Sequence, residues 1–249
     1  MTTWIVGDVH GCAEELSRLV ERLQLGPDDR LLSCGDLLHR GPDPLGVAEI
    51  LTDVGAGFVL GNHEHAVLRR CFLAPRRADA SDRPPYRGEF PALGIHDLAG
   101  DGGTPCHAEP GDGPALLRFL QGHSGYWIRG SKLDGAGPTP DGRDWFLVHA
   151  GVLPGVELEE NTVDTLIRLR YLPVRGRPWW YERYEGDELV LFGHTHSTFP
   201  RAHRPARLGG RLAALGLDTG CVYGGKLSAY SPELDELVSV SARRAWASA

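Results

Sequence analysis

Long hydrophobic runs are absent from this chain of 249 residues. The longest uncharged apolar runs, such as Trp4–Val6 and Leu189–Phe192, are strand-sized, and they fall far below the ~18 residues that a membrane-crossing helix needs. No basic segment with a following apolar core precedes the first predicted strand, as a secretory signal would require. We therefore expect no membrane partner and a cytoplasmic location.

Cysteine is scarce and irregularly spaced. The five cysteines are odd in number and include no C-x-x-C pair. This usage is typical of reduced thiols in a cytosolic protein, and it argues against a disulfide framework or a zinc–thiolate site.

Lysine is almost missing, and basic residues are outnumbered by acidic ones. The chain has 26 Lys and Arg against 33 Asp and Glu, a net charge of −7, and only Lys132 and Lys226 are lysines. An acidic balance argues against binding of duplex nucleic acid, although it is compatible with a local basic pocket for a small phosphorylated substrate. Hydrophobic residues at 41% and charged residues at 24% are ordinary globular values, which excludes a disordered or fibrous chain.

Predicted strands and helices alternate in the N-terminal third of the chain. Such alternation implies βαβ units and an α/β fold. The apolar pattern predicts strands Thr3–Val6, Arg30–Cys34 and Phe58–Leu60, and helices Ala13–Leu23, Leu45–Asp53 and His63–Phe72.

Regular patterning stops at residue 74 and returns at about residue 114. We interpret residues 74–113, rich in Arg, Asp, Pro and Gly, as a loop-rich insertion that forms a lid or cap. Beyond it we predict helix Pro114–Leu120, strands Tyr126–Ile128, Trp145–Val148 and Leu189–Phe192, and an antiparallel meander of Leu212–Leu217, Leu227–Tyr230 and Leu237–Val240. Because no linker rich in proline or serine divides the chain, we expect residues 1–249 to form a single domain.

Five predicted strands end in short motifs rich in Asp, Asn and His. In chain order these are Gly7-Asp8-Val9-His10-Gly11, Gly35-Asp36-Leu37-Leu38-His39-Arg40-Gly41, Gly61-Asn62-His63-Glu64, His149-Ala150-Gly151 and Gly193-His194-Thr195-His196. One such motif alone is typical of a turn. Ligands of open α/β sheets bind beyond the carboxyl ends of the strands, so five such endings indicate side chains that meet on one rim.

The residue types in these motifs suit a metal centre. Two Asp, one Asn and at least three His offer oxygen and nitrogen ligands without a thiolate, a set that fits Mn²⁺, Fe or Zn²⁺ better than Ca²⁺ or a soft metal. A carboxylate that bridges two ions would hold them ~3.5–4 Å apart, the spacing used to activate water and to clamp a phosphoryl group. We expect two divalent ions, with manganese favoured over iron, zinc, cobalt or nickel.

The ordered motifs resemble the signature blocks of the metallo-dependent phosphoprotein phosphatase superfamily, across nearly the whole chain. This resemblance implies a four-layer α/β/β/α sandwich of the calcineurin-like metallophosphoesterase type, with a two-metal centre between its sheets. It implies that one ion is held by Asp8, His10 and Asp36, and the other by Asp36, Asn62, His149 and His194. It also implies that His63 is the general acid and that Arg40 binds the substrate phosphate.

The C-terminal half resembles a bacterial branch of that superfamily, the symmetrical bis(5′-nucleosyl)-tetraphosphatases. The similarity lies in the closing motif Leu217–Leu227 and in the runs Arg168–Tyr171 and Arg177–Trp179. It implies a hydrolase that cleaves diadenosine tetraphosphate into two ADP. Arg170 would then reach a phosphate opposite Arg40, and Trp179 would stack on an adenine, with core packing as the alternative for Trp179 and for Trp180.

Other features resemble the protein-phosphatase branch instead. Glu64 and the Thr195-His196 pair are of that type, so a Ser/Thr (or Tyr) phosphoprotein phosphatase acting at the same site is the alternative function. His39 stands where protein phosphatases carry an Asp that orients the catalytic His, and the dinucleotide hydrolases also lack that Asp. The expected partner is therefore a small nucleotide or a phosphoprotein.

Overall fold

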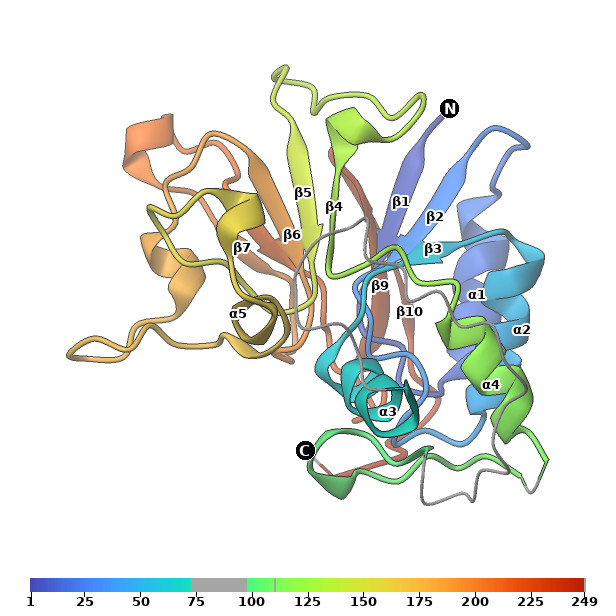
Figure 1. Cartoon of the computed structure of the whole chain (residues 1–249). Helices are drawn as coiled ribbons and strands as arrows, with labels where there is room; N and C mark the ends of the chain where they lie inside the picture. The colour runs from blue at the N-terminus through green and yellow to red at the C-terminus, as the bar shows by residue number, and fades with distance from the viewer. Residues whose placement is uncertain (73–97, 110, 249) are drawn as a thin grey trace.

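Two five-stranded sheets lie against each other in the computed structural model, which describes residues 1–72, 98–109 and 111–248 (Figure 1). The first sheet has the spatial order β10 (Glu236–Ser241), β9 (Lys226–Ser231), β1 (Thr3–Val6), β2 (Arg30–Ser33) and β3 (Gly57–Phe58). The second has the order β4 (Trp127–Arg129), β5 (Trp145–Val148), β6 (Leu189–Phe192), β8 (Ala214–Gly216) and β7 (Arg201–His203). Of the predicted lid at 74–113, residues 74–97 and 110 lie outside the described part of the chain.

Each sheet contains a parallel set of strands bordered by antiparallel ones. In the first sheet β1, β2 and β3 are parallel and β9 is antiparallel to β1; in the second β5, β6 and β8 are parallel, with β4 and β7 antiparallel to their neighbours. Helix α1 (Ala13–Leu23) connects β1 to β2, and α2 (Pro44–Asp53) connects β2 to β3. These are the βαβ units that the alternating pattern predicts.

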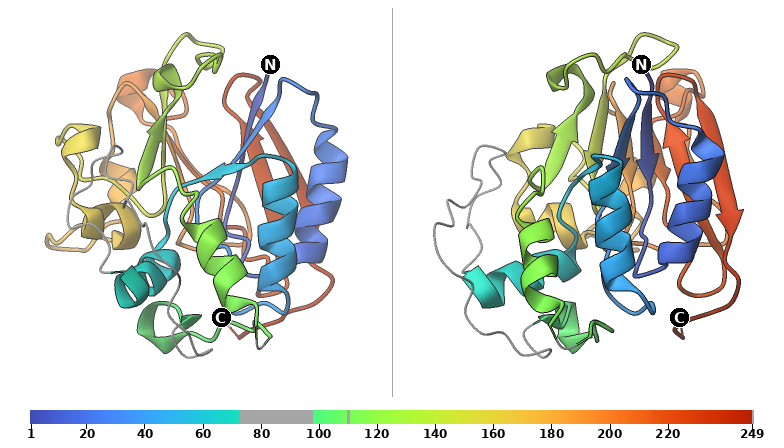
Figure 2. Two further views of the ribbon diagram at one scale, coloured as in Figure 1. Left: turned by 45° about the vertical axis from the view of Figure 1, so that its right-hand side comes forward. Right: turned by 90° about the vertical axis from the view of Figure 1, so that its right-hand side faces the viewer.

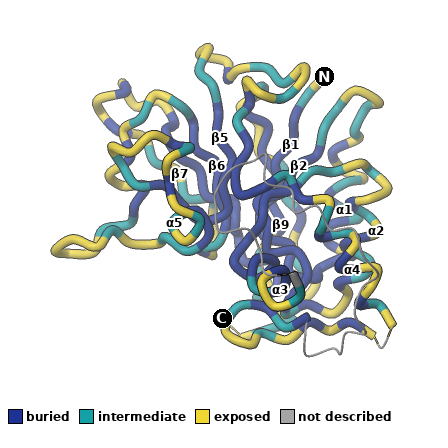
Figure 3. Tube along the Cα trace, viewed as in Figure 1, coloured by how far each residue is buried: buried dark blue, intermediate teal, exposed yellow. Residues whose placement is uncertain are grey.

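Alternating apolar side chains in the strands build the layers. Leu147 and Leu191 belong to a core between the two sheets, while their neighbours Phe146 and Phe192 pack on the outer face. Figure 3 shows that the central strands are buried. The four predicted layers are present, but the layer outside the second sheet is thin, because it consists of the short α5 (Val163–Arg168), one-turn helices and loops.

The helices α1, α2 and α4 (Gly113–Leu120) lie side by side and cover the outer face of the first sheet (Figure 2). Helix α1 has the predicted bounds, and it buries Leu16, Leu19 and Leu23 on one face. None of the helices in the described ranges is both long and apolar enough to span a membrane.

The predicted C-terminal meander is wrong in its first strand. Strand β8 pairs in parallel with β6 in the second sheet, whereas β9 and β10 form a hairpin in the first sheet. The chain crosses between the sheets over residues 217–225, and apolar alternation within a strand does not tell which partner it pairs with. The sequence pattern also missed α5 and β7, and β3 ends at Phe58 because Leu60 N–H donates to Gly125 O (2.9 Å) rather than to a strand of the sheet.

Candidate metal centre

Seven of the predicted site residues meet where the strands end. They follow β1, β2 and β3 of the first sheet and β5 and β6 of the second: Asp8, His10, Asp36, Asn62, His63, His149 and His194. All are buried except His194, which is partly exposed. Both sheets therefore supply side chains to one cluster, as the five motifs predict.

One group of possible ligands surrounds His149. Its Nε2 lies 3.1 Å from Asn62 Oδ1, 3.2 Å from His194 Nδ1 and 3.4 Å from Asp36 Oδ1. The other ring nitrogen, Nδ1, lies 2.8 Å from the carbonyl oxygen of Cys34. The ring therefore carries its proton on Nδ1, which donates to this carbonyl, and the lone pair of Nε2 is directed at the group.

A second group surrounds His10. Its Nε2 lies 3.7 Å from Asp36 Oδ2 and 4.0 Å from Asp8 Oδ2. The possible ligand atoms of Asp8, His10 and Asp36 all lie within 4.8 Å of one another, as do those of Asp36, His149 and His194. Asp36 thus directs one carboxylate oxygen toward each group.

The donor types of both groups, and the spacing of the group around His149, fit divalent ions. Ligands that lie about 2.1 Å from one ion are roughly 3.0 to 3.4 Å apart, depending on the angle between them. The donors are carboxylate and amide oxygens and imidazole nitrogens, the set that suits manganese, iron and zinc ions. The residues of the cluster could therefore hold metal ions, and Asp36 belongs to both groups of possible ligands.

The electrostatics of the cluster favour ligands in their binding forms. Burial alone would raise the pKa of Asp36, but the neighbouring imidazoles outweigh burial and hold the pKa of this carboxyl below its usual range. Burial lowers the pKa of His10 and of His194 well below the ordinary value. At neutral pH these rings are uncharged, so each has one ring nitrogen with a lone pair, as a metal ligand requires.

Four residues of the motifs adopt left-handed backbone conformations. The φ angles are 50° at His10, 51° at Asp36, 74° at Arg40 and 64° at His194. Each costs a non-glycine residue about 1 kcal/mol or more. Main-chain hydrogen bonds hold the turns in place, including the donation of His10 N–H to Asp36 O at 2.8 Å.

Glu64 fixes the loop that carries Asp36. This fully buried side chain accepts hydrogen bonds from the N–H groups of Asp36 (2.8 Å), Leu37 (2.9 Å) and Gly61 (3.1 Å). Three donors to one carboxylate hold two of the strand-end loops together. The feature that resembled protein phosphatases in the sequence therefore has a structural task in this chain.

Asp8 is held from the opposite sheet. The N–H of His194 donates to both carboxylate oxygens of Asp8, at 3.1 and 3.0 Å. A β-carbon on Gly193 would collide with that carboxylate, so this position requires glycine. These bonds join the two sheets at the cluster.

The ring of His63 points one nitrogen into the cluster. Its Nε2 lies 3.7 Å from Asp36 Oδ2, and its Nδ1 accepts a hydrogen bond from Asp101 N–H at 3.0 Å. Because Nδ1 accepts, the neutral ring carries its proton on Nε2. Burial lowers the pKa of His63, so that proton belongs to a neutral ring at neutral pH. His39 stacks on this ring with centroids 5.0 Å apart, but its own Nε2 donates to Leu98 O at 2.9 Å, so it does not orient His63 as an Asp would.

Asp101 was not found from the sequence, because it lies in the segment interpreted as an insertion. Its Oδ2 accepts a hydrogen bond from Asn62 Nδ2 at 3.0 Å and lies 3.0 Å from Arg168 Nη2. The amide of Asn62 is thereby turned so that Oδ1 faces His149. Part of the predicted lid, residues 98–109, therefore packs against the cluster and orients two of its members.

A small polar cavity of about 30 Å³ opens at the cluster. It is lined by Asp36, Arg40, Asn62, His63, Arg170, His194, His196, Asp218 and Tyr223. Arg40 Nη1 donates to His10 Nε2, and Arg170 Nε donates to His194 Nε2 at 3.1 Å. Both predicted phosphate-binding arginines thus lie beside histidines of the cluster. Burial raises the pKa of Asp218, which also lines the cavity, to about 6.

The two tryptophans lie elsewhere. Trp180 is 1% exposed and packs against Phe192, which confirms the core alternative for this residue. Trp179 does not line the cavity, and its ring already stacks on Tyr171 at 4.1 Å with the guanidinium of Arg201 at 4.6 Å. The aromatic ring at the cavity is Tyr223, which belongs to the closing motif, but only the fold shows that this ring is at the cluster.

Known proteins resemble this chain in sequence and in fold. The family described as calcineurin-like phosphoesterase matches residues 1–198. The symmetrical bis(5′-nucleosyl)-tetraphosphatase of Aeromonas hydrophila is 27% identical over 281 residues, with 96% of this chain and 97% of the relative covered. An asymmetrical bis(5′-nucleosyl)-tetraphosphatase of Geobacillus thermodenitrificans is 30% identical over 253 residues, with 90% and 88% covered. A crystal structure assigned provisionally as a diadenosine tetraphosphatase has a TM-score of 0.68 at 25% identity, with 96% and 92% covered.

Proposed function

The chain belongs to the calcineurin-like phosphoesterase family, and from this premise we propose that it hydrolyses dinucleoside polyphosphates, cleaving diadenosine tetraphosphate into two ADP. The main support for this substrate class is that two arginines, Arg40 and Arg170, line the same cavity as the possible metal ligands. A tetraphosphate chain brings several negative charges to the same place, and bidentate guanidinium groups suit them. Relatives named as tetraphosphatases support the same class.

We propose that the cluster holds two divalent ions. Asp8, His10 and Asp36 would hold one ion, and Asp36, Asn62, His149 and His194 would hold the other. Bound there, the ions would supply an activated water molecule as nucleophile and would neutralise charge on the phosphoryl group. Manganese is the favoured metal, because hard oxygen donors and imidazoles predominate.

His63 is proposed as the general acid. Its Nε2 proton faces the cluster because the N–H of Asp101 occupies Nδ1. A neutral imidazole with its proton held in this direction can donate to the leaving phosphate oxygen as the bond to phosphorus breaks. The contact with His39 keeps the ring in place without taking its proton.

The two arginines would bind phosphate oxygens. Each of them now donates to a ring nitrogen of a ligand histidine, Arg40 to His10 and Arg170 to His194. A cation that binds Nε2 of His10 uses the same lone pair, so the guanidinium of Arg40 must then turn to another acceptor. A phosphate oxygen in the cavity is that acceptor.

Product analysis tests this proposal. The Mn²⁺-loaded protein should convert diadenosine tetraphosphate into ADP alone, measured by chromatography of the nucleotides over the time course. ATP and AMP in equal amounts would instead show that cleavage is asymmetrical, as in the name of some relatives. No turnover of any dinucleoside polyphosphate would overturn the substrate class.

The alternative is a phosphoprotein phosphatase on the same site. Its main sequence support, Glu64, is explained by the three main-chain hydrogen bonds that this side chain accepts. A phosphoserine peptide would also have a single phosphate to share between Arg40 and Arg170. We therefore expect kcat/KM to be higher for the dinucleotide than for phosphopeptides, and the reverse order would support the phosphatase.

A further inference from the structure

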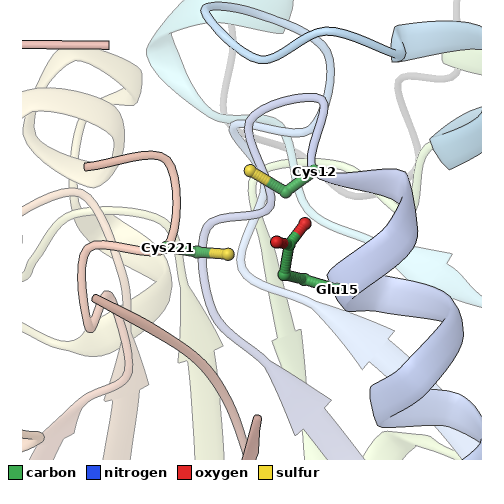
Figure 4. Close-up of side chains that lie close together, drawn as sticks. All are labelled: Cys12, Glu15 and Cys221. Atoms are coloured by element: carbon green, nitrogen blue, oxygen red, sulfur yellow. The ribbon is translucent and has the colours of Figure 1, made fainter. Parts of the chain in front are cut away.

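Three buried side chains that the proposed hydrolysis does not use converge behind the candidate metal centre. Cys12 precedes α1, Glu15 is in the first turn of α1, and Cys221 belongs to the closing loop between β8 and β9. Figure 4 shows the two sulfur atoms and the carboxylate directed toward one another. Their ligand atoms all lie within 4.8 Å of one another, the same limit that holds for the two groups around Asp36.

The burial of this cluster is complete. Cys12 is 0%, Glu15 1% and Cys221 2% exposed. A carboxylate without water normally has its oxygens hydrogen-bonded or paired with a cation. Glu15 Oε1 accepts from the N–H of Arg243 at 3.0 Å, but Oε2 is buried without a hydrogen-bond partner.

No positive side chain compensates the carboxylate in the described part of the chain. The guanidinium of Arg243, the nearest candidate by its main-chain contact, pairs with Glu14 instead. The N-terminus of α1 supplies only a partial positive charge. The free oxygen of Glu15 and the two sulfur atoms therefore present donors to a position that lacks a cation.

We propose that Cys12, Glu15 and Cys221 form a binding site for a thiophilic divalent cation of the zinc type. Two thiolates and one carboxylate are a ligand set that zinc accepts and that manganese, magnesium and calcium do not favour. A tetrahedral ion has one further position, which a water molecule can fill. The site is separate from the oxygen–nitrogen cluster, and it does not depend on the proposed hydrolysis.

The position of this site gives it a structural task. Cys12 follows two residues after His10, and Cys221 follows three residues after Asp218, which lines the cavity. An ion held by both cysteines would join the loop after β1 to the closing loop, two segments about 200 residues apart in the chain. Sequence spacing argued against a zinc–thiolate site, because this pair comes together only in the fold.

Cobalt spectroscopy tests the proposal. The purified protein is stripped of metal under reducing conditions and titrated with Co²⁺, a zinc substitute whose thiolate complexes absorb in the near ultraviolet. The proposed ligands of the oxygen–nitrogen cluster include no thiolate, so we expect this band from the proposed site and not from that cluster. We expect the band in the wild type, its displacement by Zn²⁺, and its loss in Cys12→Ser and in Cys221→Ser.

Matched controls keep the result interpretable. Cys106 is also buried, its Sγ donates to Leu38 O at 3.7 Å, and it belongs to none of the groups of possible ligands in the described part of the chain, so Cys106→Ser should keep the band. Glu15→Gln retains the shape of the side chain and should weaken Co²⁺ binding while the protein stays folded. Elemental analysis should then show one zinc ion fewer per chain than in the wild type.

Three results would overturn the proposal. The first is a wild-type titration without the charge-transfer band. The second is a band that persists in Cys221→Ser and disappears in Cys106→Ser. The third is mass spectrometry of protein purified without reductant that finds a disulfide between Cys12 and Cys221 together with no thiol-dependent metal. Because cobalt absorption is read without any substrate, a failure here is distinguishable from a failure of the proposed hydrolysis.

Discussion

The floor and the rim of the candidate metal centre are built differently. The floor, which comprises Asp8, His10, Asp36, Asn62 and His149, is at most 6% exposed. Main-chain N–H groups and buried carboxylates from both sheets hold it. The rim, which comprises Arg40, Arg170, His196 and Tyr223, is half-buried or exposed and rests on histidine rings or on its own members. In the proposed function the fold thus sets the chemistry, while the choice of substrate would belong to rim side chains that can change without loss of the fold.

The most damaging floor substitution should be Asp36→Asn. This carboxylate faces both groups of ligands, so the amide weakens binding of both proposed ions. We expect the loss in rate to exceed the 10²–10⁴-fold that a general acid contributes, equally for diadenosine tetraphosphate and for an aryl phosphate. Metal analysis should show fewer than two ions per chain. Full metal content with full activity would contradict the division between floor and rim.

His63→Asn should separate proton transfer from metal binding. The rate should fall by roughly 10²–10⁴-fold, because the Nε2 proton is lost. Metal content should be unchanged, since His63 is not among the proposed ligands. The loss should become smaller for aryl phosphates with acidic leaving groups, measured as kcat across a series of substituted phenols. A uniform loss across the series would mean that His63 is not the acid.

Asp101 connects the two regions, and Asp101→Ala should disturb the floor from outside it. Without the carboxylate, the amide of Asn62 is no longer held toward His149. Loss of such an outer partner typically weakens metal affinity or activity about 10–100-fold. Calorimetric titration with Mn²⁺ measures the effect. Asp101→Asn is the control, because it keeps an acceptor for Asn62 while it removes the charge that pairs with Arg168. Equal effects of the two variants would assign the role to the ion pair.

The smallest effect should come from the rim aromatic. If a base stacks on Tyr223, Tyr223→Ala should cost about 1–3 kcal/mol in kcat/KM for diadenosine tetraphosphate and leave an aryl phosphate nearly unaffected. Trp179→Ala should change neither reaction, because that ring lies outside the cavity. A larger loss of kcat/KM in Trp179→Ala than in Tyr223→Ala would instead indicate that the base stacks on Trp179.

The floor was more predictable from sequence than the rim, for a physical reason. Each floor residue follows the end of a strand within about four residues, and parallel strands end at one edge, so local patterning was enough to bring Asp8, Asp36 and His149 together. Rim contacts depend on how long loops fold back. The sequence pattern therefore could not find Asp101, and it could not tell whether Tyr223 or Trp179 reaches the cavity.

The same limit applies to the fold. The bounds of α1, β5 and β6 agree with the predicted ones, because strong apolar periodicity defines them. The predicted pairing of β8 was wrong, because the partner of a strand is decided by the tertiary fold and not by the pattern within the strand. The convergence of Cys12 and Cys221 was equally invisible, because their separation in the chain matches no known ligand spacing.

The hydrogen bonds between His194 N–H and Asp8 connect residues 186 positions apart in the chain, and this has a consequence for the kinetics of folding. Contacts of such high sequence separation are slow to form, because the entropy of closing the chain between them must be overcome first. We therefore predict that the floor is assembled late, after the rate-limiting step. Ions that bind the finished floor should slow unfolding and leave the folding rate almost unchanged, as expected for interactions absent from the transition state.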